Sequence, residues 1–118
     1  MAIKPVSKPL VSLTIDEPQV HLTITIGNFH VGGSFVQFED QTAPVAKGNI
    51  SQLLLGEKAV LAGRKLKIIT SVITANSVTN NIAVTIAFQG TATEPGVIHD
   101  TVDNTGDYYI LTTEYQFQ

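Results

Sequence analysis

Apolar side chains recur at every second residue along most of this chain, and that alternation restricts the fold more than any other feature. In VHLTITI, residues 20–26, valine, leucine and isoleucine alternate with histidine and threonine. NIAVTIAFQ (81–89) and YYILTTEYQF (108–117) repeat the pattern. Because successive side chains of a strand point to opposite faces, each segment predicts a strand with one buried face. The residues of the last strand expected to face the core are Tyr109, Leu111, Thr113, Tyr115 and Phe117.

Turn-forming residues separate these segments at intervals of about 8–12 residues, which is typical of a β-sandwich. Residues 65–75 predict a central strand, because both faces carry apolar side chains and β-branched residues are dense. Residues 56–63 fit either a short strand or one helical turn. We therefore expect an all-β fold, an antiparallel β-sandwich of about seven to eight strands with an immunoglobulin-like or jelly-roll topology.

Two glycine positions predict local departures from straight strands. Gly27-Asn28 allows a tight reversal between the strand at 20–26 and the next one. At Gly32-Gly33 the alternation slips by one residue, and we expect a bulge or sharp bend there. Residues 40–50 are expected to form a loop.

The chain has 118 residues and contains no cysteine, so it predicts one domain without disulfides or thiolate metal sites. Residues 1–9 contain two prolines and predict an extended N-terminal arm, either disordered or paired with an edge strand of its own or another subunit. The remaining residues, 10–118, form the sandwich domain. The start of the chain lacks an apolar stretch typical of a secretory signal, and no apolar run is long enough to span a membrane, so we expect a cytoplasmic protein.

The formal charge of −3 argues against nucleic-acid binding, which requires clustered basic residues. All seven basic residues precede residue 68, whereas residues 68–118 contain five acidic residues and no basic one. This partition either disappears when the two halves interleave in the fold, or produces faces of opposite charge that guide association.

The densest group of possible metal ligands lies in IHDTVDNTGDYYI, residues 98–110. An EF-hand loop requires glycine at position 6 and a following helix, and no register of this segment supplies both. We expect a hairpin turn closed by Gly106 in a positive-φ conformation. The alternative is an irregular calcium site whose ligands would be Asp100, Asp103, Asn104 and Asp107.

The remaining residue patterns give little indication of a metal site or a catalytic site. His21 and His30 are expected to be solvent-facing, although a tight turn at Gly27-Asn28 would make them cross-strand neighbours able to bind a metal. No nucleophile elbow, phosphate-binding loop or zinc-protease motif occurs, so we expect neither an enzyme nor a cofactor.

The sequence favours a non-catalytic interaction or assembly module that acts through protein–protein contacts. Its partner would be a second copy of the chain, in a homo-oligomer, or a component of a larger bacterial or phage-derived machine. A small-ligand or carbohydrate-binding module is the alternative, with few outward aromatic residues to support it. The residues proposed for interaction are Lys4, Lys8, Arg64, Lys65, Lys67 and Tyr108.

Overall fold

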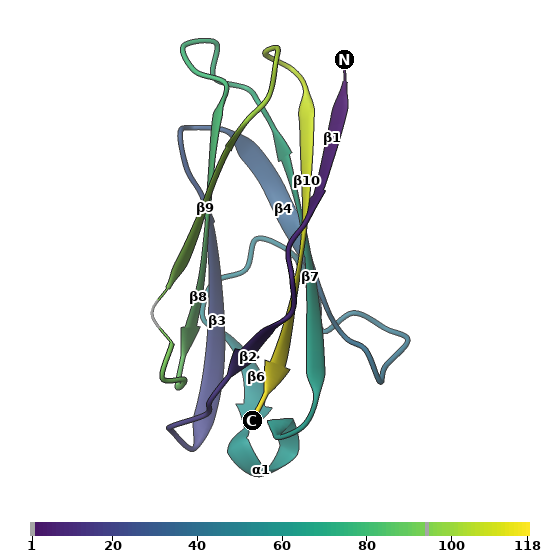
Figure 1. Ribbon diagram of the computed structural model, residues 1–118, viewed down its shortest axis with the longest axis vertical. Coiled ribbons are helices and arrows are strands. Elements are labelled where there is room, and N and C mark those ends of the chain that lie inside the picture. Colours follow the sequence, from purple (N-terminus) through teal and green to yellow (C-terminus); the bar gives the residue numbers. More distant parts are fainter. Residues whose placement is uncertain (1, 94) are drawn as a thin grey trace.

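A computed structural model describes residues 2–93 and 95–118 and shows two β-sheets packed face to face (Figure 1). The expected all-β sandwich is thereby confirmed. The strands are β1 (Ile3–Ser7), β2 (Val11–Leu13), β3 (Gln19–Ile26), β4 (Val31–Phe38), β5 (Ala46–Gly48), β6 (Leu53–Glu57), β7 (Lys65–Ile73), β8 (Asn81–Gln89), β9 (Gly96–Thr101) and β10 (Tyr108–Phe117). The ten described strands exceed the expected seven to eight mainly because the arm contributes β1 and the expected loop at 40–50 contains β5.

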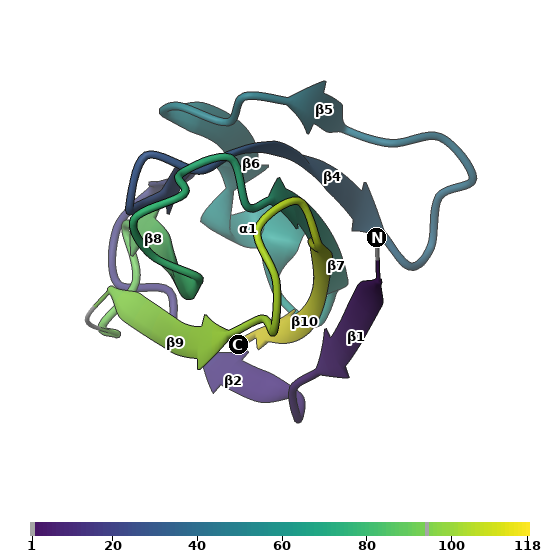
Figure 2. The same ribbon diagram turned by 90° about the horizontal axis from the view of Figure 1, so that it is seen from above.

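The larger sheet has the strand order β1-β10-β7-β4-β5, with β2 also paired to β10, and the smaller sheet has the order β6-β3-β8-β9. All pairings are antiparallel except those of β1 and β2, which run parallel to β10. Figure 2 shows the larger sheet curving around one side of the molecule, with β8 and β9 on the other. The alternation therefore reflects one inward face on each of two sheets.

The core consists of the inward side chains of both sheets. On β8, Ile82, Val84 and Ile86 are buried, as the alternation predicts, and Phe88 is half-buried against the core. The five residues of β10 predicted to face inward are all buried. Burying a large aliphatic side chain contributes about 1.5–3 kcal/mol, so the two inward faces stabilise the sandwich without cross-links.

Residues 65–73 form β7, which lies between β10 and β4, so the prediction of a central strand is confirmed. Residues 56–63 contain the single-turn helix α1 (Lys58–Leu61), which resolves the alternative left by the sequence. The helix places Leu61 in the core with no exposed surface. After this turn Gly63 adopts a φ of 85°, and the chain enters β7.

Of the two alternatives predicted at Gly32-Gly33, a bulge or a sharp bend, the bulge is wrong. The register between β4 and β7 is unbroken from Val31, opposite Ile73, to Phe38, opposite Leu66. Glycine is required at position 32 for another reason, since a Cβ there would lie 1.9 Å from the carbonyl oxygen of Ser71. The glycine pair thus marks close contact between neighbouring strands rather than an inserted residue.

The expected tight reversal at Gly27-Asn28 and the expected hairpin before β10 are both connections between sheets. β3 belongs to the smaller sheet and β4 to the larger one, so the reversal at Gly27-Asn28 carries the chain across the sandwich. β9 and β10 are likewise in different sheets. The turn before β10 does contain Gly106 with a φ of 93°, as predicted, but it is not a hairpin turn.

The N-terminal arm lies along the edge of the larger sheet within its own chain. β1 places Ser7 opposite Thr112, and β2 places Val11 opposite Tyr115. The arm therefore uses one residue more than β10 between these two pairs, which is a bulge at residues 8–10. Val6 and Leu13 can both face the core only because this extra residue shifts the alternation.

Candidate functional site

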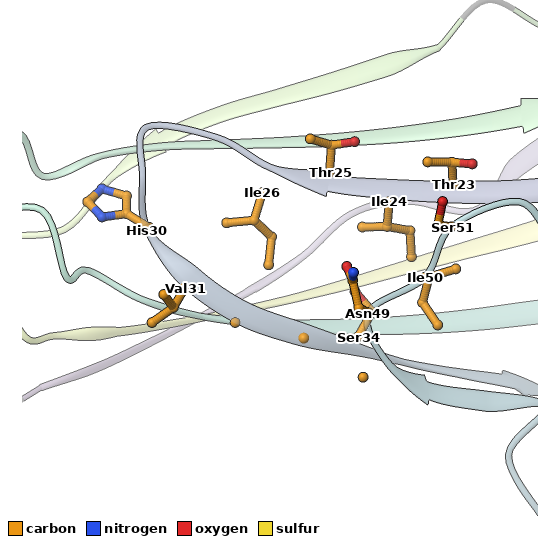
Figure 3. Close-up of a pocket in the computed structure, with 13 residues that line it drawn as sticks. Thr23, Ile24, Thr25, Ile26, His30, Val31, Ser34, Asn49, Ile50 and Ser51 are labelled. Carbon is orange, nitrogen blue, oxygen red and sulfur yellow. The ribbon is translucent and has the colours of Figure 1, made fainter.

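A groove of about 430 Å³ lies between the end of β3, in the smaller sheet, and the start of β4, in the larger sheet. Figure 3 shows Ile24 and Ile26 of β3 on one side and Val31 and Ser34 of β4 on the other. His30 closes one end, and the crossing segment 48–51 closes the other. The groove is thus bordered by the edges of two strands from opposite sheets.

Within residues 2–93 and 95–118, no strand pairs with this edge of β3 beyond Leu22. Pairing with β6 ends at Leu22, and beyond it the Ile24 amide donates to the carbonyl of Ile50 at 3.0 Å. On the opposite side, the Gly27 amide donates to Ala83 at 2.8 Å. Because backbone groups of alternate residues point to alternate sides of a strand, the N–H and C=O of Ile26 point into the groove. In the part of the chain that the structure describes, no strand pairs with them.

Among the residues that the structure describes, no strand pairs with the edge of β4 at the same level. β5 pairs with residues 34–36 only, and the carbonyl of Val36 on that side accepts a hydrogen bond from Val45 at 2.8 Å. Gly32 lies four residues before Val36 on the same strand, so its N–H and C=O point to the same side as those of Val36, which here is the groove. Since Gly32 and Gly33 carry no side chain, the backbone is open to an approaching chain.

His30 has a structural position, and the expectation that it is solvent-facing is wrong. Its side chain is buried, with Nε2 3.0 Å from the carbonyl of Asn81 and Nδ1 accepting a hydrogen bond from the Asn76 amide at 3.3 Å. These two bonds define the tautomer with the proton on Nε2. His21 lies opposite Gln89 and Leu54, so the two histidines are not cross-strand neighbours.

Phe29 is exposed at the His30 end of the groove. Its side chain is 91% exposed, and both Asn28 and Phe29 adopt positive φ, at 59° and 58°. The Asn28 amide group donates to the carbonyl of Asn81, and the Asn76 amide group donates to the carbonyl of Asn28. Positive φ is uncommon for aromatic residues, so these bonds hold a strained loop that presents an aromatic ring to solvent.

Lys4 joins the arm to the smaller sheet. Its ammonium group lies 2.7 Å from Asp100 and donates to the carbonyl of Thr101 at 2.8 Å. The hydrogen bond from Lys4 lowers the pKa of the Asp100 carboxyl. The phenol of Tyr109 donates to the same carboxylate, and burial raises the pKa of this phenol far above its usual range. Lys4 is thus one half of an internal ion pair.

Arg64 is paired at the opposite end of the larger sheet. It donates two hydrogen bonds to Asp40, at 2.9 and 2.7 Å, and its guanidinium carbon lies 3.8 Å from the centroid of the Phe38 ring. The side-chain hydrogen bond from Arg64 lowers the pKa of the Asp40 carboxyl. The charged fork thereby fixes the loop after β4 to the start of β7.

The structure does not gather the six proposed interaction residues into one surface. Lys65 and Lys67 lie on the exposed face of β7, with Lys67 opposite Glu114. Tyr108 is half-buried at the other end of β10, between Ile3 and Ile73. Lys8 lies beside an apolar cleft on the far side of the sandwich. The pairing of Lys4 with Asp100 and the register of Lys67 with Glu114 show that the basic and acidic parts of the sequence interleave.

The four residues of the alternative calcium site have separate partners. Asp107 is buried and accepts hydrogen bonds from the amides of Ala2, at 2.9 Å, and Asn104, at 3.1 Å. Asp100 is engaged by Lys4 and Tyr109, and the carbonyl of Asp103 accepts a bond from Asn80. Within the described residues, no group of three or more histidine, aspartate or glutamate side chains is placed to hold a metal ion.

Comparison of the chain with models of protein families, with curated proteins and with solved structures gave no match. Across residues 2–93 and 95–118, no helix has the length and hydropathy needed to cross a membrane. The geometry of the groove is therefore the main basis for a functional argument. The sequence contained one sign of it, the glycine pair at 32–33, which the alternation alone assigns to a bulge.

Proposed function

We propose that this protein is a non-catalytic interaction module that binds an extended protein segment in the groove between β3 and β4. The observation that supports it most directly is the pair of unpaired strand edges, at Ile26 and Gly32, facing one groove. An extended segment that enters the groove gains backbone hydrogen bonds by strand addition. The segment belongs to a second copy of this chain or to another component of an assembly.

The side chains around the groove suit such a segment. Ile24 and Ile26 provide an apolar wall for alternate side chains of the incoming strand, and Val31, 54% exposed, lies on the opposite side. Phe29 extends the contact surface beyond the His30 end, and exposed aromatic residues are frequent centres of binding energy. The residues that line the groove include no Lys, Arg, Asp or Glu. Threonine, serine and asparagine side chains line it together with the isoleucines, so its recognition rests on backbone bonds and uncharged side chains.

Amide hydrogen exchange tests the edge geometry directly. In the free protein we expect fast exchange at Ile26 and Gly32 and slower exchange at Gly27, whose amide is bonded to Ala83. Peptides selected from a random display library should slow exchange at Ile26 and Gly32 when they bind. Peptides that bind without protecting either amide would overturn the proposed mode.

A matched pair of variants locates the contact. Val31→Lys should weaken peptide binding and any self-association seen by light scattering, because a charged side chain at the groove opposes strand addition. Phe29→Ala should weaken binding with little effect on stability, since the ring is almost fully exposed. Val60→Lys is the control, because Val60 is similarly exposed, at 58%, on α1 away from the groove. Equal effects of Val31→Lys and Val60→Lys would contradict the proposal.

A further inference from the structure

A second cleft, of about 350 Å³, opens on the other side of the sandwich between β2 and β10 of the larger sheet and β8 and β9 of the smaller one. Figure 2 shows β2 and β9 flanking this side. Its lining is mostly apolar and comes from Val11, Leu13, Ile86, Phe88, Ile98 and Tyr115. A cavity of about 150 Å³ with apolar walls holds one benzene ring, so this cleft has room for a molecule of one or two rings.

The cleft exists because the arm leaves β10 between β1 and β2. Lys8 makes the last bond of the first segment, donating its amide to Thr112 at 2.9 Å, and Pro9 has no amide to donate. The bulge at residues 8–10 then carries the chain away from Thr113 before β2 resumes at Val11. Thr113 consequently has no cross-strand partner in the arm, because β1 ends opposite Thr112 and β2 begins opposite Tyr115.

Thr113 carries an unused hydrogen-bonding group at this cleft. Its side chain is 3% exposed, and among the described residues its hydroxyl has no hydrogen-bond partner. Burial raises the pKa of the neighbouring Tyr115 phenol, and the Thr113 hydroxyl lowers it by a smaller amount, but the two groups do not reach hydrogen-bond geometry. Since leaving a buried hydroxyl unpaired is unfavourable by about 1–3 kcal/mol, a bound polar atom would relieve a real defect.

The aromatic side chains of the cleft favour a flat ring. Phe88 meets Tyr115 edge to face, with ring centroids 4.8 Å apart, and Phe117 at 5.9 Å. Such clusters accept a further ring in offset or edge-to-face contact. Lys8 and Glu114 lie at the rim with opposite charges, which gives no preference for an anion or a cation.

From these observations we propose that the cleft binds a small, uncharged aromatic molecule of one or two rings that carries one hydrogen-bond donor, of the indole or phenol type. The rings lie among Phe88, Tyr115 and Ile98, and the donor bonds the hydroxyl oxygen of Thr113. This site is separate from the groove between β3 and β4, so its test is independent of the proposed interaction function.

Indole and 1-methylindole are the probes, since they differ at the N–H donor. The chain contains no tryptophan, so indole fluorescence reports binding without an indole background from the protein. We expect indole to bind the wild-type protein roughly two- to tenfold more tightly than 1-methylindole, the factor that one neutral hydrogen bond supplies. In Thr113→Val this preference should disappear, while the denaturant midpoint of the free protein rises because the unpaired hydroxyl is gone.

A matched pair on β9 tests the location. Ile98 lines the cleft, whereas its neighbour Val97 is 50% exposed and points to the other face of the strand. Ile98→Phe should fill the cleft and abolish indole binding, and Val97→Phe should leave binding unchanged. The proposal is overturned if indole does not bind at millimolar concentration, if both phenylalanine variants bind it equally, or if Thr113→Val keeps the preference for indole.

Discussion

Gly32 occupies a position in β4 that has no room for a side chain. A Cβ there would lie 1.9 Å from the carbonyl oxygen of Ser71 and 3.0 Å from Ile26. The first atom belongs to the backbone of the central strand β7 and cannot rotate away. The glycine therefore sets how closely β4 approaches β7, and it also leaves the groove open.

Gly32→Ala should destabilise the protein by about 2–3 kcal/mol, the upper part of the range for strain from overpacking. Gly96→Ala is the control, because the structure places nothing within 4 Å of the added methyl group and the residue lacks a positive φ. We expect the control to lie within about 0.5 kcal/mol of the wild type. Denaturant unfolding of the wild type and the two variants measures these differences. If glycine served only to make the strand flexible, both variants would change the free energy of unfolding by the same amount.

The ion pair between Lys4 and Asp100 predicts a pH-dependent contribution to stability. Because Lys4 holds the pKa of folded Asp100 below its ordinary 3.8, the pair stabilises the fold above that value, and the contribution is lost as the pH falls through the lower, folded pKa. Lys4→Met should reduce the free energy of unfolding by about 0.5–1 kcal/mol at neutral pH, since both side chains are partly exposed. The difference from the wild type should shrink below about pH 4.

Unfolding of both proteins in denaturant at a series of pH values measures this difference. Lys58→Met is the matched control, because in the described residues the ion pairs involve only Lys4 and Arg64 as cations. A Lys4→Met effect that stays constant down to strongly acidic pH would show that the side chain acts through packing or through the Thr101 carbonyl instead.

At the scale of elements, β4 and β7 are joined by a buried hydroxyl pair as well as by their backbone ladder. Ser34 and Thr70 lie opposite each other, with their hydroxyl oxygens 2.9 Å apart, and neither side chain is accessible to more than a trace of solvent. Each hydroxyl satisfies the other, so the pair is tolerated inside an apolar core.

Ser34→Ala should cost about 1–3 kcal/mol, because it leaves the Thr70 hydroxyl buried without this partner. Adding Thr70→Val should recover a large part of that loss, since the double variant buries no hydroxyl at this position. A double-mutant cycle from denaturant unfolding measures the coupling. Strictly additive effects of the two substitutions would mean that the hydroxyls act independently.

The elements themselves were largely predictable from the alternation, whereas their partners were not. The inward faces of β8 and β10 follow from local periodicity, because burial of one face needs only a period of two. The sheet to which each strand belongs depends on contacts between distant residues. Turn formers such as Gly27-Asn28 or Asp103–Gly106 permit both a hairpin and a crossing between sheets, so they do not distinguish the two.

The groove between β3 and β4 could not be predicted from the sequence either, because its position depends on which sheet each strand joins. Ile26 and Gly32 are close in the sequence, but they become two facing edges only because β3 and β4 lie in opposite sheets. The burial of His30 similarly depends on Asn76 and Asn81, which a different connection brings near it. Charge composition was a poor guide, because Lys4 and Asp100 meet through strand pairing that the sequence does not reveal.

For the whole molecule, the arm governs which edges are open to other chains. β10 is the longest strand, and its residues 108–117 contain neither lysine nor proline, the usual protections of an exposed edge. β1 and β2 cover that edge, and β1, which is itself an end strand of the larger sheet, contains Lys4 and Pro5. The wild-type chain therefore protects the β10 edge and leaves the edges at the β3–β4 groove open.

A variant that begins at Leu10 should lose this protection. It lacks the pairing of β1 with β10, the ion pair at Asp100 and the bond from Ala2 to Asp107, and we expect a loss of about 2–3 kcal/mol in the free energy of unfolding. Light scattering should show association beyond that of the full chain, through the uncovered residues 108–112.

A peptide of residues 2–9 supplied in trans should reverse both effects, whereas a scrambled peptide of the same composition should not. Rescue by the ordered peptide alone would show that parallel pairing with β10, and not chain length, controls the edge. A truncated protein with the stability and molecular mass of the full chain would instead mean that β10 does not need a covering strand, and the arm would then be free to serve as the extended segment that enters another copy.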